Sequence, residues 1–127
     1  MTIFRYSLLI LWASASQAEP ILTPSGHAVT LYDVVLEPND GIARFRYLAP
    51  AIDPAGQGLG HDDVVGDFKW LCETVAIPGL IAAEKSADHV IITFSDREVE
   101  FGVATPEATQ FIESYSVEGT TCIWDEF

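Results

Sequence analysis

Basic residues are scarce in this chain: six lysines and arginines stand against 19 aspartates and glutamates among 127 residues. All the acidic residues but only five of the basic ones follow residue 18, so the chain beyond that point carries a net charge of −14. A field of this sign repels nucleic acid and anionic membrane surfaces. We therefore expect no nucleic-acid partner. The charge favours solubility and a cationic partner, and an acidic secreted protein from a salty habitat explains it equally well.

Cysteines and catalytic signatures are also sparse. The two cysteines, Cys72 and Cys122, form no CxxC redox motif, and the chain contains no GxSxG, HExxH or EF-hand spacing. A catalytic triad assembled from distant residues would leave no such signature. The sequence therefore predicts no cofactor and gives no motif that assigns a reaction.

Long apolar runs are lacking except near the N-terminus. After Arg5, apolar residues dominate from Tyr6 to Ala13 and lead to the small-residue site Ser16-Gln17-Ala18. This pattern predicts a cleavable secretory signal over residues 1–18, because a run of about eight apolar residues is too short to span a bilayer. An uncleaved anchor is the alternative. We expect residues 19–127 to form a single domain in the periplasm or outside the cell, without membrane insertion.

If the chain is exported, its two cysteines are in an oxidising compartment. An even number of cysteines in an oxidising compartment indicates a disulfide between Cys72 and Cys122. Closing a loop of about fifty residues stabilises a small domain by about 4 kcal/mol in the chain-entropy model. We therefore predict that this bond staples the fold.

The stretch that organises the predicted fold is HVIITFSDREVEFGV, residues 89–103. Alternation of apolar and polar residues predicts two strands joined by a turn at Ser95-Asp96-Arg97. The six apolar side chains expected on its single buried face are Val90, Ile92, Phe94, Val99, Phe101 and Val103. Other elements must cover that face, since six apolar side chains are not left in water.

A second hairpin is predicted upstream, from residues 27–37 and 42–49 around the turn Pro38-Asn39-Asp40-Gly41. A Gly- and Pro-rich loop follows. A helix is expected to begin at Asp62 or Asp63 and to be interrupted at Pro78-Gly79. Its buried stripe would comprise Val64, Phe68, Leu71, Cys72 and Val75.

The C-terminal part predicts a second helix over residues 105–115, because Thr105-Pro106-Glu107 resembles a helix start and apolar residues follow at helical spacing. Residues 120–125 are expected to form a last strand. The order is β-β-α-β-β-α-β. We predict a small α+β domain with an antiparallel sheet of about five strands, helices packed on one face and one disulfide.

The best candidate for a metal site is His61-Asp62-Asp63 together with Asp67 one helical turn on, which gathers an imidazole and three carboxylates at the mouth of a loop. An acidic helix N-terminus beside a loop histidine is the competing, purely structural interpretation. The sequence does not separate the two.

Arg44 and Arg46 project from the same face of a predicted strand and provide a possible contact for an anion or a partner. Pairing with carboxylates such as Glu98 and Glu100 on a neighbouring strand is the structural alternative. Trp70 and Trp124 offer binding platforms in the same sense, although packing around the nearby cysteines explains them without a ligand.

Several runs of the sequence resemble a known family. They are residues 91–102 (IITFSDREVEFG), 105–115 (TPEATQFIESY) and 119–124 (GTTCIW), with Trp70-Leu71-Cys72 in the predicted helix. Together they are similar to small exported proteins of alphaproteobacteria of the Rhodobacter group, a domain of unknown function. The resemblance covers essentially the whole chain after residue 18. The two cysteines match its pattern, which further supports the disulfide, and it implies no catalytic or binding residues.

Two classes of function follow from these observations. The first is an exported acidic protein without enzymatic activity, which binds a protein or small-molecule partner or stabilises an assembly. The second is a small hydrolase or metal-dependent enzyme with its site near His61, Asp62, Asp63 and Asp67. The small size, the staple and the missing catalytic signatures favour the first.

We predict that signal peptidase cleaves after Ala18, so that the exported protein begins at Glu19. The small residues of the Ser16-Gln17-Ala18 site follow the apolar run directly. N-terminal sequencing of protein from the exported fraction tests this. Protein that starts at Met1 and stays in the cytoplasmic fraction would contradict both the cleavage and the argument for an oxidising compartment.

Overall fold

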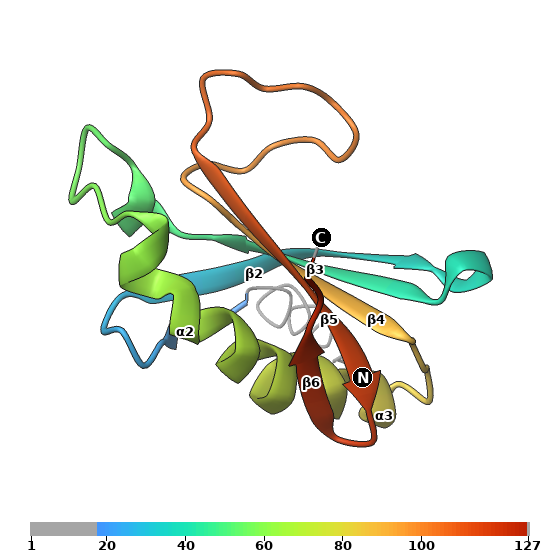
Figure 1. The fold of residues 1–127 in the computed structure, drawn as a ribbon. Coiled ribbons are helices and arrows are strands. Elements are labelled where there is room, and N and C mark those ends of the chain that lie inside the picture. Colours follow the sequence, from blue (N-terminus) through green and yellow to red (C-terminus); the bar gives the residue numbers. More distant parts are fainter. Residues whose placement is uncertain (1–17, 127) are drawn as a thin grey trace, which may run out of the picture.

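The computed structural model describes residues 18–126, in which six strands form one mixed sheet in sequence order (Figure 1). The strands are β1 (Ile21–Leu22), β2 (Ala28–Glu37), β3 (Ile42–Leu48), β4 (His89–Ser95), β5 (Gln110–Glu118) and β6 (Thr121–Trp124). A continuous helical segment joins β3 to β4. It consists of α2 (His61–Leu71), the π-helical turn η3 (Cys72–Ala76) and α3 (Ile77–Ala82). The predicted α+β class is confirmed, whereas the predicted signal lies almost entirely outside the described residues.

The prediction of an antiparallel sheet of about five strands is wrong in one respect that shapes the whole fold. β3 and β4 are parallel, with Ala43 opposite Val90 and Phe45 opposite Ile92. The other neighbouring pairs are antiparallel. A helix that crosses the sheet once returns the chain to the end where β3 began, so the next strand runs in the same direction. β1, where the sequence analysis predicts no strand, adds the sixth strand.

The first hairpin is confirmed, with β2 and β3 joined by the turn η1 (Pro38–Asp40). Gly41 ends this turn at φ 68°, a left-handed conformation that glycine adopts without strain. A bulge between Leu31 and Asp33 shifts the register of β2. As a result Tyr32 lies against Arg46 on the outer face of the sheet, the face turned away from the helix. It does not share a face with Val34, as it would in a strand without a bulge.

The first predicted helix forms, one residue earlier than expected. Its start is capped by Asp63, whose Oδ2 accepts the Gly60 N–H at 2.8 Å. Of the predicted stripe, Val75 is partly buried and the other members are fully buried, namely Val64, Phe68, Leu71 and Cys72. The predicted interruption at Pro78 does not occur. Proline has no N–H to donate to the carbonyl four residues back, and the wider π-helical turn immediately before α3 accommodates the missing hydrogen bond.

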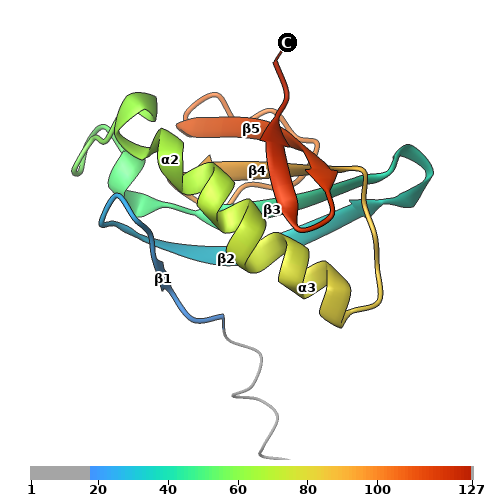
Figure 2. The ribbon, with the colours of Figure 1, turned by 60° about the horizontal axis from the view of Figure 1, so that its bottom comes forward.

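The core lies between this helical segment and the inner face of the sheet, as the view in Figure 2 shows. The central strands supply the largest buried side chains, among them Tyr47, Ile92 and Phe94. Phe94 stacks on Phe68 of α2 with ring centroids 4.3 Å apart. The inward alternation of Val90, Ile92 and Phe94 predicted for β4 is therefore confirmed.

The helix predicted over residues 105–115 is wrong, because this region contributes β5. Gln110 to Ser116 pair with β4 along its full length. A spacing of four residues, as between Phe111 and Tyr115, satisfies a strand as well as a helix, so the apolar pattern did not decide between them. The open hydrogen-bonding edge of β4 decides, since a helix would leave its backbone groups without partners. The order along the chain is thus three strands, one helical segment and three strands.

The predicted second arm of the central hairpin, residues 99–103, is not a strand either. It belongs to the strap, which we define as the long connection of residues 96–109 between β4 and β5 (Figure 1). β5 occupies the edge of β4 that this arm would need. The strap instead folds onto the outer face, where Phe101 lies over Arg44 and Arg46 with 5.5 and 5.4 Å between guanidinium carbon and ring centre.

The predicted disulfide is present in the structure. Cys72 and Cys122 are bonded and completely buried, with their Cα atoms 6.3 Å apart. The bond joins the helical segment to the last strand across 50 residues of sequence. Beside it, the carboxylate of Glu73 accepts the backbone N–H of Cys122 at 3.0 Å. The C-terminal hairpin is thereby fixed to the helix by a covalent bond and a charged hydrogen bond.

Tyr47→Phe should raise the free energy of unfolding by up to about 1 kcal/mol. Tyr47 is fully buried, its hydroxyl has no hydrogen-bond partner among the described residues, and burial raises its pKa well above the ordinary value. Removing an unpaired buried hydroxyl relieves a desolvation penalty. Urea denaturation of the two proteins measures the difference.

Tyr32→Phe is the matched control, because the Tyr32 hydroxyl accepts the Val99 N–H. It should lower the free energy of unfolding slightly. A loss of 1 kcal/mol or more in Tyr47→Phe would contradict the prediction, since it would mean that the hydroxyl is paired.

Candidate functional site

Each histidine of the chain is joined to a carboxylate that is distant in sequence. The pairs are His27 Nε2 with Asp67 at 3.0 Å, His61 Nε2 with Glu113 at 2.6 Å, and His89 Nδ1 with Asp125 at 3.3 Å. Pairs of this kind stabilise folds and also perform acid-base chemistry and ligand binding. Their surroundings decide which role each pair has.

The pair of His27 and Asp67 is buried and structural. Asp67 is 1% exposed and also accepts the backbone N–H of Ser25 at 3.0 Å and its hydroxyl at 2.6 Å. The carboxylate therefore fixes the segment before β2 to the middle of α2. A ligand has no access to it, because its lone pairs are occupied and its surface is covered.

The pair of His89 and Asp125 lies at the margin of the outer face. Asp125 accepts hydrogen bonds from the hydroxyls of Ser114, at 2.7 Å, and Ser116. A serine-histidine-aspartate triad uses the two nitrogens of the imidazole for different partners. Here Nδ1 faces both Ser116 and Asp125, at 3.4 and 3.3 Å. The geometry is that of an anchor for the C-terminal residues.

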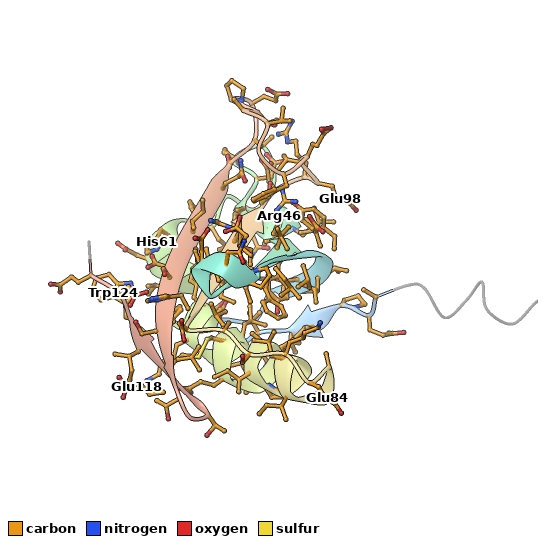
Figure 3. All side chains as sticks on the ribbon, turned by 90° about the vertical axis from the view of Figure 1, so that its right-hand side faces the viewer. Arg46, His61, Glu84, Glu98, Glu118 and Trp124 are labelled. Atoms are coloured by element: carbon orange, nitrogen blue, oxygen red, sulfur yellow. A yellow bond between two sulfur atoms is a disulfide. The ribbon has the colours of Figure 1, made fainter. Side chains whose placement is uncertain are left out.

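The pair of His61 and Glu113 differs because it lies in an open cleft. The cleft has a volume of about 250 Å³ and is lined by His61, Val65, Glu113, Tyr115 and Trp124. It lies where the first turn of α2 meets β5 and β6, on the side of the molecule where Figure 3 shows His61 and Trp124. We define these five residues as the aromatic cleft.

Aromatic rings surround the imidazole of His61. The ring of Phe68 stacks on it at 5.9 Å between centroids, and Phe111 meets it edge-on at 5.6 Å. Trp124 donates its indole N–H to Oε1 of Glu113 at 2.6 Å, while His61 holds Oε2. Both carboxylate oxygens are thus bound within the chain, which fixes the orientation of the group at the floor of the cleft.

The cleft combines polar groups that are held in place with apolar surface that is exposed. Trp124 and Val65 are 54% and 46% exposed, whereas the Glu113 side chain is 14% exposed. Burial and the negative charges of Glu113 and Glu73 raise the pKa of Tyr115 to about 12, so its hydroxyl stays protonated. The arrangement is suited to hold a ligand that presents a ring or chain to Trp124 and a polar group to Glu113.

The four residues that the sequence singled out for a metal do not converge. His61 faces Glu113, Asp63 caps the helix, and Asp67 is buried on another face against His27. Asp62 is fully exposed, 3.9 Å from Nδ1 of His61. Among residues 18–126 no three His, Cys, Asp or Glu side chains are arranged to hold a metal ion. Of the four, only His61 reaches the cleft.

Arg44 and Arg46 pair with carboxylates, but not with Glu98 or Glu100. Arg44 contacts Glu37 at 3.3 Å and Arg46 contacts Asp33, both on the adjacent strand β2. Arg46 is 5% exposed and also donates to the Val99 carbonyl at 2.8 Å. These arginines hold the strap against the outer face, and Arg46 presents little surface to an anion or a partner.

Sequence reasoning missed Glu113 and did not place Trp124. Glu113 fell inside a predicted helix, where a carboxylate normally faces water. Its only signal was a position between Phe111 and Tyr115, which in a strand share its face. Trp124 was assigned to packing around the disulfide, yet its ring is more than half exposed. His61 contacts Glu113 across 52 residues of sequence, and Trp124 joins the site through its own hydrogen bond to Glu113.

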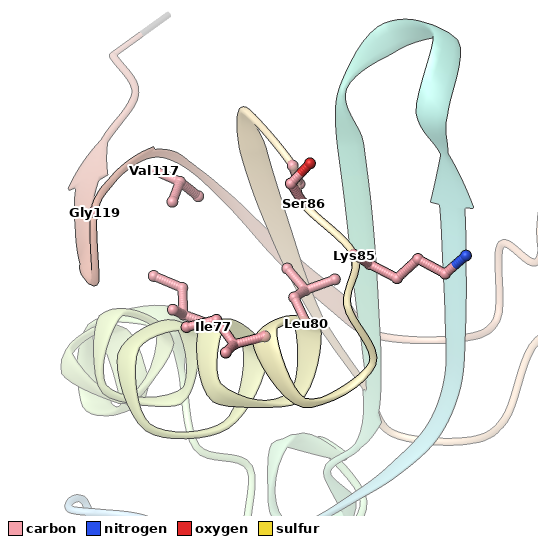
Figure 4. A pocket seen from close by; sticks show the side chains of 8 residues that line it. Ile77, Leu80, Lys85, Ser86, Val117 and Gly119 are labelled. Atoms are coloured by element: carbon pink, nitrogen blue, oxygen red, sulfur yellow. The ribbon is translucent and has the colours of Figure 1, made fainter.

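A second cavity, of about 120 Å³, lies between α3 and the hairpin of β5 and β6 (Figure 4). Ile77, Leu80 and Val117 surround it, and the Lys85 side chain points away from it. Its lining is mostly apolar, with Ser86 and Lys85 as the polar members, and it lacks the fixed carboxylate that the aromatic cleft has. The aromatic cleft is therefore the better candidate for a functional site.

Fold and site together define a small disulfide-stapled α+β protein with a mixed sheet and an aromatic cleft. The chain belongs to the family of unknown function DUF6497, whose family model matches residues 8–127. No curated protein and no solved structure matches the chain significantly. In the described part of the chain, no helix is both long and apolar enough to cross a membrane.

Asp125→Asn should lower the free energy of unfolding by about 1 kcal/mol near neutral pH. Partial burial acts to raise the pKa of Asp125, but hydrogen bonds from Ser116, Ser114 and His89 outweigh it and hold the pKa below its ordinary value. Because the folded-state pKa is lowered, the stabilisation is complete above about pH 4 and is lost as the pH falls through the folded-state value. Denaturation of both proteins near neutral pH, at ~pH 4 and at ~pH 2.5 measures the difference.

The difference in the free energy of unfolding between the wild type and Asp125→Asn should therefore disappear in acid. Asp40→Asn, in the exposed turn after β2, serves as the control and should cause a small change that hardly depends on pH. If the difference for Asp125→Asn stays the same at all three pH values, the ionised Asp125 carboxylate does not stabilise the fold as predicted.

Proposed function

We propose that this protein is an exported, non-enzymatic binding module that recognises its partner through the aromatic cleft. The observation that carries the proposal is the contact of Trp124 with Glu113, which places an exposed indole ring beside an oriented carboxylate. Rigid aromatic side chains with a polar edge are enriched at recognition sites, because they bury much area at little cost in conformational entropy. The net negative charge of the chain agrees with a recognition site that contains a carboxylate, since this charge disfavours anionic partners.

Export is part of the proposal. It is supported by the apolar run near the N-terminus, which has the length and the flanking residues of a secretory signal. The bonded pair of Cys72 and Cys122 supports it independently, because such bonds persist in oxidising compartments. A binding module in the periplasm or outside the cell has no access to cytoplasmic reductants, so its staple stays intact.

A second candidate function is favoured by one observation. A histidine bonded to a carboxylate at 2.6 Å in a cleft is the arrangement of a general base. A hydrolase would use it to activate water. If the cleft is catalytic, His61→Asn abolishes turnover while the substrate still binds. If it is a binding site alone, the same variant changes affinity and leaves no reaction to lose.

Trp124→Ala should weaken binding of the natural partner by about 2 kcal/mol, the cost of removing a central aromatic side chain from an interface. The test is capture from the exported fraction on immobilised protein, followed by titration of the retained partner. Ile123→Ala is the matched control, since Ile123 is the neighbour of Trp124 on β6, lies on the opposite face and is 43% exposed.

The partner should bind the wild type and Ile123→Ala alike and lose affinity for Trp124→Ala. Equal binding to all three proteins would show that the cleft is not the recognition site. Failure of the wild type to retain any partner would leave the binding module without support.

A further inference from the structure

We propose that the aromatic cleft takes an organic cation, an ammonium or guanidinium group that lies on the ring face of Trp124 and is neutralised by Glu113. The inference rests on the proposed function, because it names the ligand class of the same site. It follows from the orientation of the indole, the partial burial of the carboxylate and the distribution of charge around the cleft.

The indole of Trp124 is oriented by its own hydrogen bond. The N–H is donated to Oε1 of Glu113 at 2.6 Å, which commits one edge of the ring and leaves its face free. Trp124 is 54% exposed and lines the cleft together with Val65, Tyr115 and the pair of His61 and Glu113. Tryptophan has the ring face that attracts cations most strongly. A cation on this face lies next to the carboxylate that holds the ring.

Glu113 provides the countercharge. Its side chain is 14% exposed, so the carboxylate is only partly hydrated, and it lies at the floor of the cleft between His61 and Trp124. Opposite charges attract more strongly in such surroundings than in water. Asp62 and Asp63, which follow His61 in the first turn of α2, add negative charge and offset the positive end of the helix dipole.

The basic residues among residues 18–126 do not oppose this charge. Apart from His61, whose imidazole is hydrogen-bonded to Glu113, no basic side chain in the described part of the chain lines the cleft, and none of the five lysines and arginines does. Each of four lies beside a carboxylate elsewhere: Arg44 with Glu37, Arg46 with Asp33, Lys69 with Glu73, and Arg97 with Asp96. The fifth, Lys85, follows α3 beside the second cavity. An acidic protein with this distribution concentrates cations near the cleft and repels anions. A neutral sugar stacks on an indole but gains nothing from the charge.

The test uses the indole N–H resonance of Trp124 in nitrogen-15-labelled exported chain, identified by its absence in Trp124→Phe. Three probes are titrated: agmatine, a short acetylated peptide amide with a central arginine, and the same peptide with citrulline, the neutral isostere of arginine. Agmatine and the arginine peptide should shift the resonance. The affinity of the citrulline peptide should be lower than that of the arginine peptide by at least about tenfold. Raising the salt concentration should weaken the binding of the cationic probes only.

Two variants connect the binding to the residues. Glu113→Gln keeps the size and an acceptor oxygen for the Trp124 N–H but removes the charge, so affinity for both cations should fall by about tenfold or more. Trp124→Phe, followed through the backbone resonances of β6, should bind more weakly than the wild type, because phenylalanine attracts cations less. Ile123→Ala should bind both probes like the wild type. Thermal melting of each variant confirms that it is folded.

The two cationic probes distinguish the source of the ligand. Agmatine binding as tightly as the peptide points to a free small amine or guanidine, and tighter binding of the peptide points to a basic side chain of a protein partner. Equal binding of the arginine and citrulline peptides, an unchanged affinity in Glu113→Gln, or no shift with either cation would overturn the inference.

Failure of the cation inference is distinguishable from failure of the proposed function. If Trp124→Ala loses its captured partner while no cation shifts the indole resonance, the cleft is a recognition site for another ligand class. If capture does not depend on Trp124, the proposed function itself is wrong.

Discussion

The packing of one helical segment across the inner face of the sheet is the constraint on which the rest of this structure depends. The segment returns the chain to the start of β3 and thereby makes β4 its parallel neighbour. It also brings Cys72 to the last strand, where the disulfide fixes the C-terminal hairpin. Because a single helix covers only one face, the outer face is left to the strap, which Arg44 and Arg46 hold through Phe101 and the Val99 carbonyl.

The aromatic cleft is a consequence of the same packing. Glu113 lies on the face of β5 that turns toward α2, opposite Ile92, where a carboxylate without partners would be costly. The first residue of the helix and the last residue of β6 supply its two donors, His61 and Trp124. The groups that satisfy this charge also leave an indole ring and an aliphatic side chain exposed around it. The three residues that satisfy this charge are therefore also the ones on which the proposed binding role rests.

The sequence predicted the elements whose patterns admit one interpretation. The first hairpin formed around Pro38-Asn39-Asp40-Gly41, the inward side of β4 was as expected, and the helix buried the stripe that includes Phe68. Prediction from the sequence failed where one pattern of apolar residues fits two kinds of secondary structure. Phe111 and Tyr115, four residues apart, suit a helix and a strand alike, and Val99 to Val103 alternate like a strand although no free edge remains to pair with them.

The sequence by itself determined the acidic charge and the α+β class, because composition and local periodicity depend on neighbouring residues alone. It also predicted the disulfide, from an even cysteine count after a predicted secretory signal, and singled out the histidine that lines the candidate site. Only the tertiary structure decided the parallel pairing of β3 with β4, the conversion of residues 110–118 into a strand, and the choice of Glu113 over Asp62 and Asp63 as the partner of His61. The reason is physical: which backbone edge is free and which carboxylate meets which imidazole depend on how distant segments pack, and no local pattern records that.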